Sequence, residues 1–242
     1  MRNDIENARI DLAAALRWAA RLGYQQGVCN HFSFLLPGSD NLFLVNPEGL
    51  FWSEIRASDL LVCDLDGQIV GGKGTVEITA FCLHAPIHRR NKKARAVLHC
   101  HTPYTTALCL IEDAKVEPVN IAGLQFYGHI AYDEDCQGGA LSPEEGDREA
   151  EILGDKNVLM MRNHGPIVIG PTVAAAFDRL YYLEEVCQRQ LLAMSSNRPL
   201  KQLGHSIAKG LADEVALFEV YSQKHLAAIK RTLDREAPDY AS

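Results

Sequence analysis

The segment ARAVLHCHTPY (94–104) restricts the fold most strongly, because it joins an apolar strand pattern directly to a helix start. Residues 94–99 are typical of a short strand, and Thr102-Pro103 opens a helix, since proline is favoured at the first helical position. Side chains alternate between the two faces of a strand, so His99 and His101 point the same way and Cys100 points the other way. The end of this strand therefore offers two imidazoles to one cation, or carries two ordinary polar residues. The pair alone leaves both interpretations open.

Hairpins and helices alternate along the rest of the chain. Apolar runs separated by turn residues predict strands at 31–36, 42–45, 60–63, 68–70, 94–99, 157–161 and 167–169. Helical spacing predicts helices at 3–23, 77–90, 102–110, 143–153, 171–194 and 207–233. Hairpins mixed with helices imply an α/β protein, with a mixed or antiparallel sheet covered by helices.

Composition excludes several classes of protein. A chain of 242 residues with 47% hydrophobic content can bury a substantial core, and no linker-like segment divides it, which favours one domain with a helical tail. The formal net charge of −7 argues against nucleic acid as a partner. The first 23 residues lack an uninterrupted apolar run, so neither a signal peptide nor a membrane span is expected. Seven cysteines without a C-x-x-C pair suit a reducing cytoplasm.

A third histidine lies in a comparable position. Asn163-His164-Gly165 follows a second apolar strand on a tight turn, where His164 either faces a cleft or bonds to the local backbone. The predicted helix 77–90 carries Glu77 and His84, seven residues apart and therefore on one face. This helix runs into the strand that bears His99, and it is the expected source of a carboxylate near a metal.

Three neutral imidazoles leave a divalent ion with open coordination positions, which is the pattern of a catalytic site. Zinc fits this ligand type best, and manganese, iron or cobalt are alternatives. Such an ion can polarise a carbonyl oxygen and hold an enolate, or it can generate hydroxide for hydrolysis.

Six segments together resemble the class II aldolase/adducin family, whose fold is that of the fuculose-phosphate-type aldolases. They are GVCNHFSF (27–34), LVNPEGLFW (44–52), DLDGQIVGG (64–72), FCLHAPIHRR (81–90), AVLHCHTPYTTAL (96–108) and MRNHGPIVIG (161–170). The resemblance covers residues 8–195 and is strongest to the adducin-like branch. It implies a three-layer α/β/α domain with a central, mostly antiparallel sheet over residues 1–200. Residues 201–242 are expected to form a helical extension packed on the same domain.

The resemblance also implies a site. It assigns His99, His101 and His164 as ligands of a divalent metal, and it implies a homotetramer or another homo-oligomer. The sugar-phosphate aldolases carry a serine pair and a glutamate shortly before a helix histidine. If His84 is that histidine, the glutamate position is Ala80.

The phosphate-binding features are also incomplete. The two serine positions then fall at Ile78 and Thr79, and isoleucine cannot bind phosphate. Glu48 in a second phosphate-binding stretch would repel one. A carboxylate or a neutral polyol is therefore the more plausible substrate. Asn30, which the family pattern retains, and Arg162 are the candidate substrate-binding residues.

The function expected from these features is that of a metal-dependent carbon–carbon lyase acting on a small hydroxy-carbonyl or hydroxy acid. Either decarboxylation or retro-aldol cleavage would leave an enolate stabilised by the cation. Glu77, His84 and Tyr132 are the candidates for the acid that protonates the product. The alternatives are a non-catalytic adducin-like interaction module and, with less support, a metallohydrolase.

Overall fold

A single eight-stranded sheet forms the centre of the described part of the protein. The computed structural model describes residues 2–135, 141–215 and 220–242. The strand order is β4-β3-β2-β1-β5-β8-β7-β6, and every neighbouring pair is antiparallel except β6 and β7, which are parallel. The strands are β1 (His31–Leu35), β2 (Leu42–Val45), β3 (Leu61–Asp64), β4 (Ile69–Gly71), β5 (Ala96–His99), β6 (Ile130–Asp133), β7 (Val158–Met161) and β8 (Gly165–Gly170).

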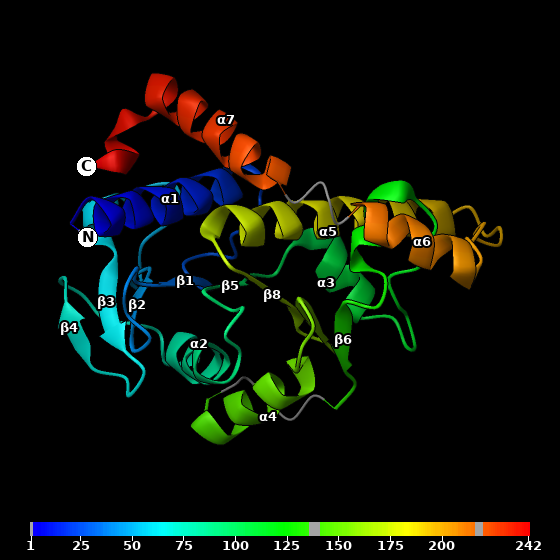
Figure 1. Cartoon of the computed structure of the whole chain (residues 1–242), viewed down its shortest axis with the longest axis horizontal. Helices are drawn as coiled ribbons and strands as arrows, with labels where there is room; N and C mark the ends of the chain where they lie inside the picture. Colours follow the sequence, from blue (N-terminus) through cyan, green and yellow to red (C-terminus); the bar gives the residue numbers. More distant parts are fainter. Residues whose placement is uncertain (1, 136–140, 216–219) are drawn as a thin grey trace.

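Helices cover both faces of this sheet (Figure 1). One face carries α1 and α5, and the other carries α2 and α4, while α7 lies outside α1. The helices are α1 (Arg2–Arg21), α2 (Ile78–Arg90), α3 (Pro103–Cys109), α4 (Pro143–Leu153), α5 (Val173–Met194), α6 (His205–Val215) and α7 (Tyr221–Glu236). The predicted three-layer α/β/α fold with a mostly antiparallel sheet is therefore confirmed.

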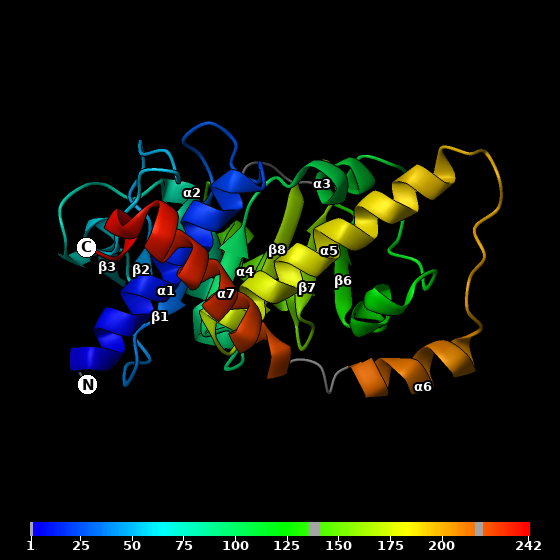
Figure 2. The same ribbon diagram turned by 90° about the horizontal axis from the view of Figure 1, so that it is seen from above.

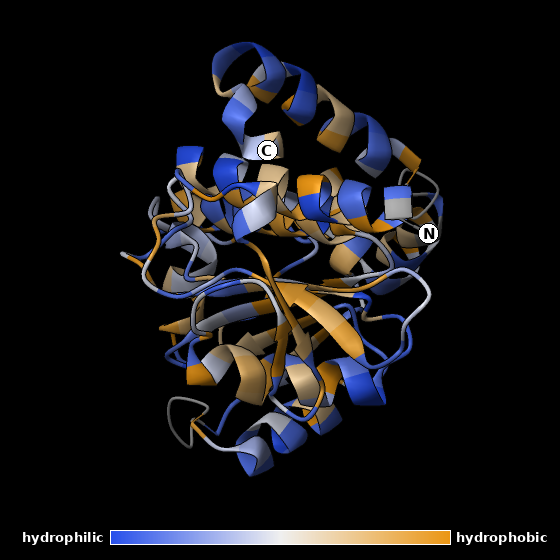
Figure 3. Cartoon of the chain, turned by 90° about the vertical axis from the view of Figure 1, so that its left-hand side faces the viewer, coloured by the Kyte–Doolittle hydropathy of each residue, from blue (hydrophilic) through white to orange (hydrophobic). Residues whose placement is uncertain are grey.

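The alternation of side chains along β5 divides the interior into two apolar layers. Leu98 and Cys100 are buried in the larger core with residues of α1 and α5. Val97 faces the opposite way and packs with Leu83 and Ile87 of α2. Figure 3 shows the same arrangement, with apolar strands enclosed by helices whose outer surfaces are mainly hydrophilic. Cys100 thus points away from the face to which His99 belongs, as the strand pattern predicts.

Two features of the chain differ from the sequence-based expectation. The sequence pattern does not predict strand β6, because its residues do not alternate cleanly and its partner β7 lies downstream in the sequence. The helix expected at 207–233 is two helices, α6 and α7, on either side of residues 216–219, which lie outside the described residues. They bury different surfaces, since α7 packs on α1 and α5 whereas α6 packs on residues 121–126 (Figure 2). The division at residue 200 stays a prediction.

Helices α2 and α4 approach each other closely because a glycine lies at their contact. A Cβ atom on Gly146 of α4 would be 1.8 Å from the carbonyl oxygen of Cys82 in α2, so no other residue fits without separating the helices. Helix α4 begins at Pro143, and the side chain of Ser142 accepts a hydrogen bond from the Glu145 N–H.

We expect Gly146→Ala to lower the free energy of unfolding by about 3 kcal/mol, because the added methyl group must push α4 away from α2. Urea denaturation followed by circular dichroism measures this change. Gly210→Ala is the matched control, since nothing lies within 4 Å of a Cβ at that exposed position in α6. Alanine there should leave stability unchanged or raise it by up to ~1 kcal/mol. Equal stability of the two variants would contradict the close helix contact.

Candidate metal centre

Three histidines from separate segments meet at one end of the sheet. His99 ends β5, His101 follows two residues later, and His164 lies in the turn between β7 and β8. One ligand nitrogen from each ring lies within 4.8 Å of the others. The ring centroids are 5.1 Å apart for His99 and His101, 4.8 Å for His99 and His164, and 4.9 Å for His101 and His164. The structure therefore brings the three predicted ligands together.

Hydrogen bonds fix the orientation of two of these rings. His99 Nδ1 donates to the carbonyl oxygen of Pro166 at 3.0 Å, and His101 Nδ1 donates to the side-chain oxygen of Gln26. A neutral imidazole that donates from Nδ1 keeps the lone pair on Nε2. His101 Nε2 is buried and has no hydrogen-bond partner among the residues described. An unpartnered lone pair of this kind, with its other nitrogen held by an oxygen, fits a metal ligand.

Burial keeps the three imidazoles in the neutral form that a metal requires. Desolvation, followed by the neighbouring imidazoles, lowers the pKa of His99 well below its usual value. The same causes lower the pKa of His164 to about 4. Desolvation also lowers the pKa of His101, while the Glu77 carboxylate acts in the opposite direction. Protons therefore compete weakly with a cation near neutral pH.

The turn that carries His164 is built to bring its imidazole close to His101. Asn163 adopts a positive φ of 59°, which asparagine tolerates better than most residues. A Cβ atom on Gly165 would lie 3.1 Å from His101 Cδ2 and 3.3 Å from Thr106 Oγ1. A side chain at position 165 would therefore press on the ring of His101.

Helix α3 is anchored immediately after the second ligand. The buried carboxylate of Glu184 in α5 accepts hydrogen bonds from the backbone N–H of Tyr104 and Thr105, at 2.7 and 2.8 Å, and from the Thr105 hydroxyl at 2.7 Å. A carboxylate at this helix end also complements the helix dipole. Glu184 thus holds the start of α3, and with it the segment that carries His101.

An open pocket of about 470 Å³ adjoins the histidines. His101, His164 and Asn163 line one part of it, and the rest is formed by Gln25, Gln26, Pro103, Thr106, Ala107 and Leu110. The hydroxyl of Thr106 is buried and has no partner in the described part of the chain. The pocket is large enough for a small organic molecule next to the histidines.

Glu77 lies just before α2 and not inside it. It is the N-cap residue of this helix, and its carboxylate oxygen is 2.8 Å from Thr79 Oγ1. Because the helix begins at Ile78, the expectation that Glu77 and His84 share a helix face does not describe their positions. The effect of Glu77 on the pKa of His101 nevertheless places its carboxylate within electrostatic range of the histidine cluster.

His84 is fully buried behind the cluster and does not line the pocket. Its Nε2 is 2.8 Å from His31 Nδ1, and its Nδ1 is 2.5 Å from Ser33 Oγ. The imidazole of His31 lies beside that of His99, with ring centroids 5.2 Å apart. Sequence reasoning missed His31, although its spacing from Ser33 signals that both face one side of β1.

The remaining candidates lie in different surroundings. Arg162 and Tyr132 line a second pocket, of about 260 Å³, which shares Asn163 and Leu110 with the first. The Tyr132 hydroxyl accepts a hydrogen bond from the Val116 N–H at 3.0 Å, so its oxygen is already engaged. Arg162 is exposed, and its guanidinium has no hydrogen-bond or ion-pair partner among the described residues.

Asn30 precedes β1 with a positive φ of 76° and is buried, with 4% exposure. Its backbone oxygen accepts a hydrogen bond from the Asn46 side chain at 3.2 Å. Its side-chain oxygen is buried without a partner in the described segments. The roles predicted for Asn30, Arg162 and Tyr132 in binding or catalysis stay predictions.

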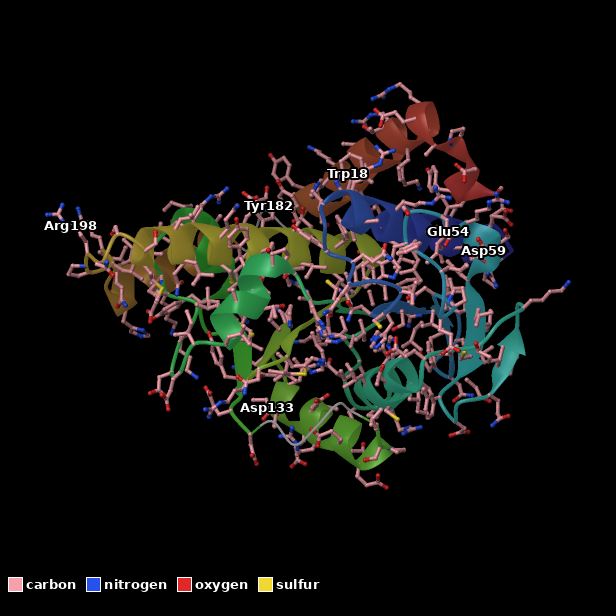
Figure 4. The ribbon with its side chains drawn as sticks, turned by 180° about the vertical axis from the view of Figure 1, so that it is seen from behind. Trp18, Glu54, Asp59, Asp133, Tyr182 and Arg198 are labelled. Carbon is pink, nitrogen blue, oxygen red and sulfur yellow. The ribbon has the colours of Figure 1, made fainter. Side chains whose placement is uncertain are left out.

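A second group of possible metal ligands lies around the guanidinium of Arg148. Asp133, Glu145 and Glu149 have carboxylate oxygens within 4.8 Å of one another. Arg148 donates to both oxygens of Asp133, at 3.0 and 2.5 Å, and to both oxygens of Glu145, at 2.9 and 2.7 Å. Figure 4 places Asp133 on the side of α4, opposite the helix layer that carries Trp18 and Tyr182. Arg148 thus pairs with Asp133 and Glu145 as an ion-pair cluster, whereas the buried Oε2 atom of Glu149 has no hydrogen-bond partner among the described residues.

Comparison with known proteins places the chain in a family. The family model described as Class II Aldolase and Adducin N-terminal domain matches residues 10–191. The decarboxylase NovR of Streptomyces niveus is 30% identical over 227 residues, covering 92% of this chain and 84% of that protein. Alpha-adducin of Rattus norvegicus is 32% identical over 192 residues, which are 78% of this chain but 26% of the adducin.

A solved structure agrees with these relatives. The crystal structure of an aldolase II superfamily protein from Pseudomonas syringae superposes with a TM-score of 0.92 at 32% identity, covering 99% of this chain and 96% of that one. The resemblance read from the sequence segments is therefore confirmed. The chain belongs to the class II aldolase and adducin family.

Proposed function

We propose that this protein is a divalent-metal-dependent carbon–carbon lyase acting on a small hydroxy-carbonyl or hydroxy-carboxylic acid. The observation that carries the proposal is the meeting of His99, His101 and His164 beside an open pocket, with the His101 Nε2 lone pair buried and unpartnered among the described residues. The family includes lyases, and the similarity to the decarboxylase NovR supports a reaction of that kind.

The three histidines would hold the metal, and zinc fits a set of neutral imidazole ligands best, with manganese, iron or cobalt as alternatives. When bound, the ion would supply a Lewis acid that polarises a substrate oxygen. The chain's own part is to keep the ligands neutral and oriented. Pro166 and Gln26 do this for His99 and His101, and burial does it for all three.

A phosphorylated sugar remains a poor candidate substrate. The hydroxyl of Ser33 lies in contact with His84 and His88 in the interior, and Ser33 is 0% exposed. Ile78 is exposed but offers no hydrogen-bond donor, and the Glu48 carboxylate is bonded to the Thr75 hydroxyl at 2.7 Å. The guanidinium of Arg162, in the adjoining pocket, favours a substrate with a carboxylate group.

Decarboxylation is the reaction we favour over retro-aldol cleavage. It needs no base to abstract a proton first, but it needs an acid to protonate the carbon that loses carbon dioxide. Glu77 is the candidate we favour, because its carboxylate influences the pKa of His101. His84 lies behind the pocket wall, and the oxygen of Tyr132 is engaged by the backbone, so both are less suited to direct contact with a substrate.

The protein is also proposed to act in the cytoplasm as a homo-oligomer, with a homotetramer as the expected form. The six cysteines that the structure describes are free, as a reducing compartment would allow. Leu110 is 61% exposed at the edge of both pockets, and Ile111 beside it is 41% exposed, so a second subunit could cover this rim. Within the described segments, no helix has the length and apolar character needed to cross a bilayer.

We expect His101→Ala and His164→Ala to lose bound metal almost completely, because each removes one of three neutral ligands. Inductively coupled plasma mass spectrometry of the purified proteins measures the metal content. His129→Ala is the matched control, since this histidine is exposed and distant in sequence from the cluster. Metal bound at full stoichiometry in both ligand variants would refute the site. Absence of metal from the unmodified protein would instead favour the adducin-like interaction module.

Incubating the metal-loaded protein with carboxyl-labelled hydroxy acids tests the reaction itself. Labelled carbon dioxide indicates decarboxylation, and a pair of carbonyl products indicates retro-aldol cleavage. Chelation should abolish either activity, and zinc should restore it. Hydrolysis of esters with no carbon–carbon cleavage would contradict the proposal and support a metallohydrolase.

We expect Arg162→Gln to lower kcat/KM for a carboxylate substrate by roughly 10- to 100-fold, since hydrogen bonds to charged groups contribute about 1.5–3 kcal/mol. Steady-state kinetics on the acid and on its methyl ester measure this effect. The loss should disappear for the ester, which lacks the charge. Arg198→Gln provides the control, because Arg198 is exposed at the far end of the molecule (Figure 4). An equal loss on acid and ester would exclude Arg162 as the carboxylate partner.

A further inference from the structure

The side of helix α3 that lines the pocket beside the histidines carries no charged side chain. Pro103, Thr106, Ala107 and the C-cap residue Leu110 recur at the spacing of one helical face, and all four line this pocket of about 470 Å³. Leu110 is 61% exposed, and Thr106 and Ala107 are partly exposed. A helix face in contact with water normally carries polar or charged groups. This face of α3 instead offers an apolar surface to a molecule that enters the pocket.

The core holds α3 in this orientation. The opposite face of the helix consists of Thr105, Leu108 and Cys109, which are 0, 0 and 9% exposed. The carboxylate of Glu184 binds the backbone of the first turn. Rotating the helix to bury Leu110 would expose Leu108 and break the hydrogen bonds to Glu184. The apolar face therefore stays turned to the pocket.

The glutamine side chains at the pocket are already engaged by the protein. Gln25 accepts a hydrogen bond from the backbone N–H of Trp52 at 2.8 Å and donates one to the carbonyl oxygen of Gly27. The side-chain oxygen of Gln26 accepts from His101. Of these two amide groups, only the nitrogen of Gln26 is left to bind a ligand.

The Thr106 hydroxyl adds no further group for a ligand. Thr106 Oγ1 is buried, and it lies 3.3 Å from the place that a Cβ atom on Gly165 would take, so it faces the turn and not the open side of the pocket. Apart from the histidines, the amides of Asn163 and Gln26 are the polar groups that remain free among the described lining side chains. These amides satisfy few of the hydroxyl groups of a sugar-like chain.

Charged side chains are separated from this pocket. The described residues that line it include no lysine, arginine, aspartate or glutamate. Arg162, Glu112 and Asp113 line the second pocket instead, while Leu110 and Asn163 line both. The pocket beside the histidines therefore selects by apolar contact more than by charge.

Such surroundings favour carbon over hydroxyl groups on the part of a substrate that lies against α3. Moving a methylene group from water onto an apolar surface is favourable. A hydroxyl group that leaves water without finding a partner loses its hydrogen bonds, which is unfavourable. A polyol chain would bring several such groups against Ala107 and Leu110, and an alkyl chain would bring none.

We propose that the substrate of this site is a hydroxy acid or hydroxy-carbonyl compound with an apolar substituent, and that Ala107 and Leu110 select it against a polyol. The inference rests on the proposed lyase function and names its substrate class. It separates the two substrate types that the sequence leaves open, because it assigns an acid with an apolar chain and excludes a polyol.

A second copy of the chain is the other occupant that this face allows, since Leu110 lies at the rim. The position of Thr106 and Ala107 favours a small ligand, because both line a pocket whose volume is typical of small-molecule sites. The two occupants differ in what a change at Leu110 alters. A substrate contact alters ligand preference, and a subunit contact alters oligomeric state.

Isothermal titration calorimetry of the zinc-loaded protein with 2-hydroxyhexanoate and with gluconate tests the selection. The two probes share their chain length, their carboxylate and the hydroxyl group on the second carbon, but gluconate carries a hydroxyl group on each remaining carbon as well. Their affinity ratio therefore reports the surroundings of the chain. We expect 2-hydroxyhexanoate to bind roughly 10-fold more tightly, at the lower end of the range for an added methylene group, because the pocket is open. Metal content measured after each titration shows that gluconate has not removed the zinc.

Leu110→Asn should reduce this preference to about 3-fold or less, because it removes apolar contact and adds an amide that can bind hydroxyl groups. Leu110→Met should keep the preference. Leu192→Asn is the matched control, since Leu192 is 60% exposed in α5 and lines neither pocket. Circular dichroism and size-exclusion chromatography with light scattering follow the fold and the oligomeric state of each variant.

Four results would overturn the proposal: gluconate binding as tightly as 2-hydroxyhexanoate, no measurable binding of either acid, full preference in Leu110→Asn, or cleavage of polyhydroxy acids alone. Full preference together with an altered oligomeric state in Leu110→Asn would assign the face to a subunit contact. The titrations need no turnover. A preference for 2-hydroxyhexanoate without carbon–carbon cleavage of any acid would instead contradict the proposed lyase function and leave the ligand preference of the pocket established.

Discussion

The antiparallel pairing of β1 with β5 is the interaction on which the site depends. In this register His31 lies opposite His99, and Ser33 lies opposite Val97. A shift by one residue would turn His31 and Ser33 toward the apolar core that Phe32 and Phe34 occupy. The burial of those two phenylalanines therefore fixes His31 beside His99, one of the candidate metal ligands.

The pairing of β1 with β5 also explains why several histidines can be buried, because it places His31 and Ser33 where they form hydrogen bonds with histidines of α2. An isolated buried imidazole loses the hydrogen bonds that water would give it, at a cost of about 1–3 kcal/mol for each unsatisfied group. Here His31, His84 and His88 satisfy one another through Ser33, and Ala94 closes the series. The outer end of this series, at Thr79 and Glu77, is partly exposed to solvent. A network whose buried members are all hydrogen-bonded favours one arrangement of its side chains.

Much of this could be predicted from local sequence patterns. Strand alternation places His99 and His101 on one face, and the turn at Gly165 places His164 at a strand end, but only the resemblance to the family assigns the three as metal ligands. His31 is different, because its place beside His99 follows from strand pairing between segments about 70 residues apart. The sequence pattern placed Glu77 wrongly for another reason. Its neighbours read as helical, but the helix starts one residue later, and the N-cap geometry turns the carboxyl group toward Thr79.

The departures from the sugar-phosphate aldolase pattern have one physical explanation in this arrangement. Where the resemblance leads one to expect phosphate-binding serines, the chain has Ile78 and Thr79. Ile78 faces outward, and the hydroxyl of Thr79 is directed to His31 and Glu77. A hydroxyl committed to both neighbours cannot also bind phosphate. The segment before α2 therefore presents no free hydroxyl at the positions where the resemblance places phosphate-binding serines.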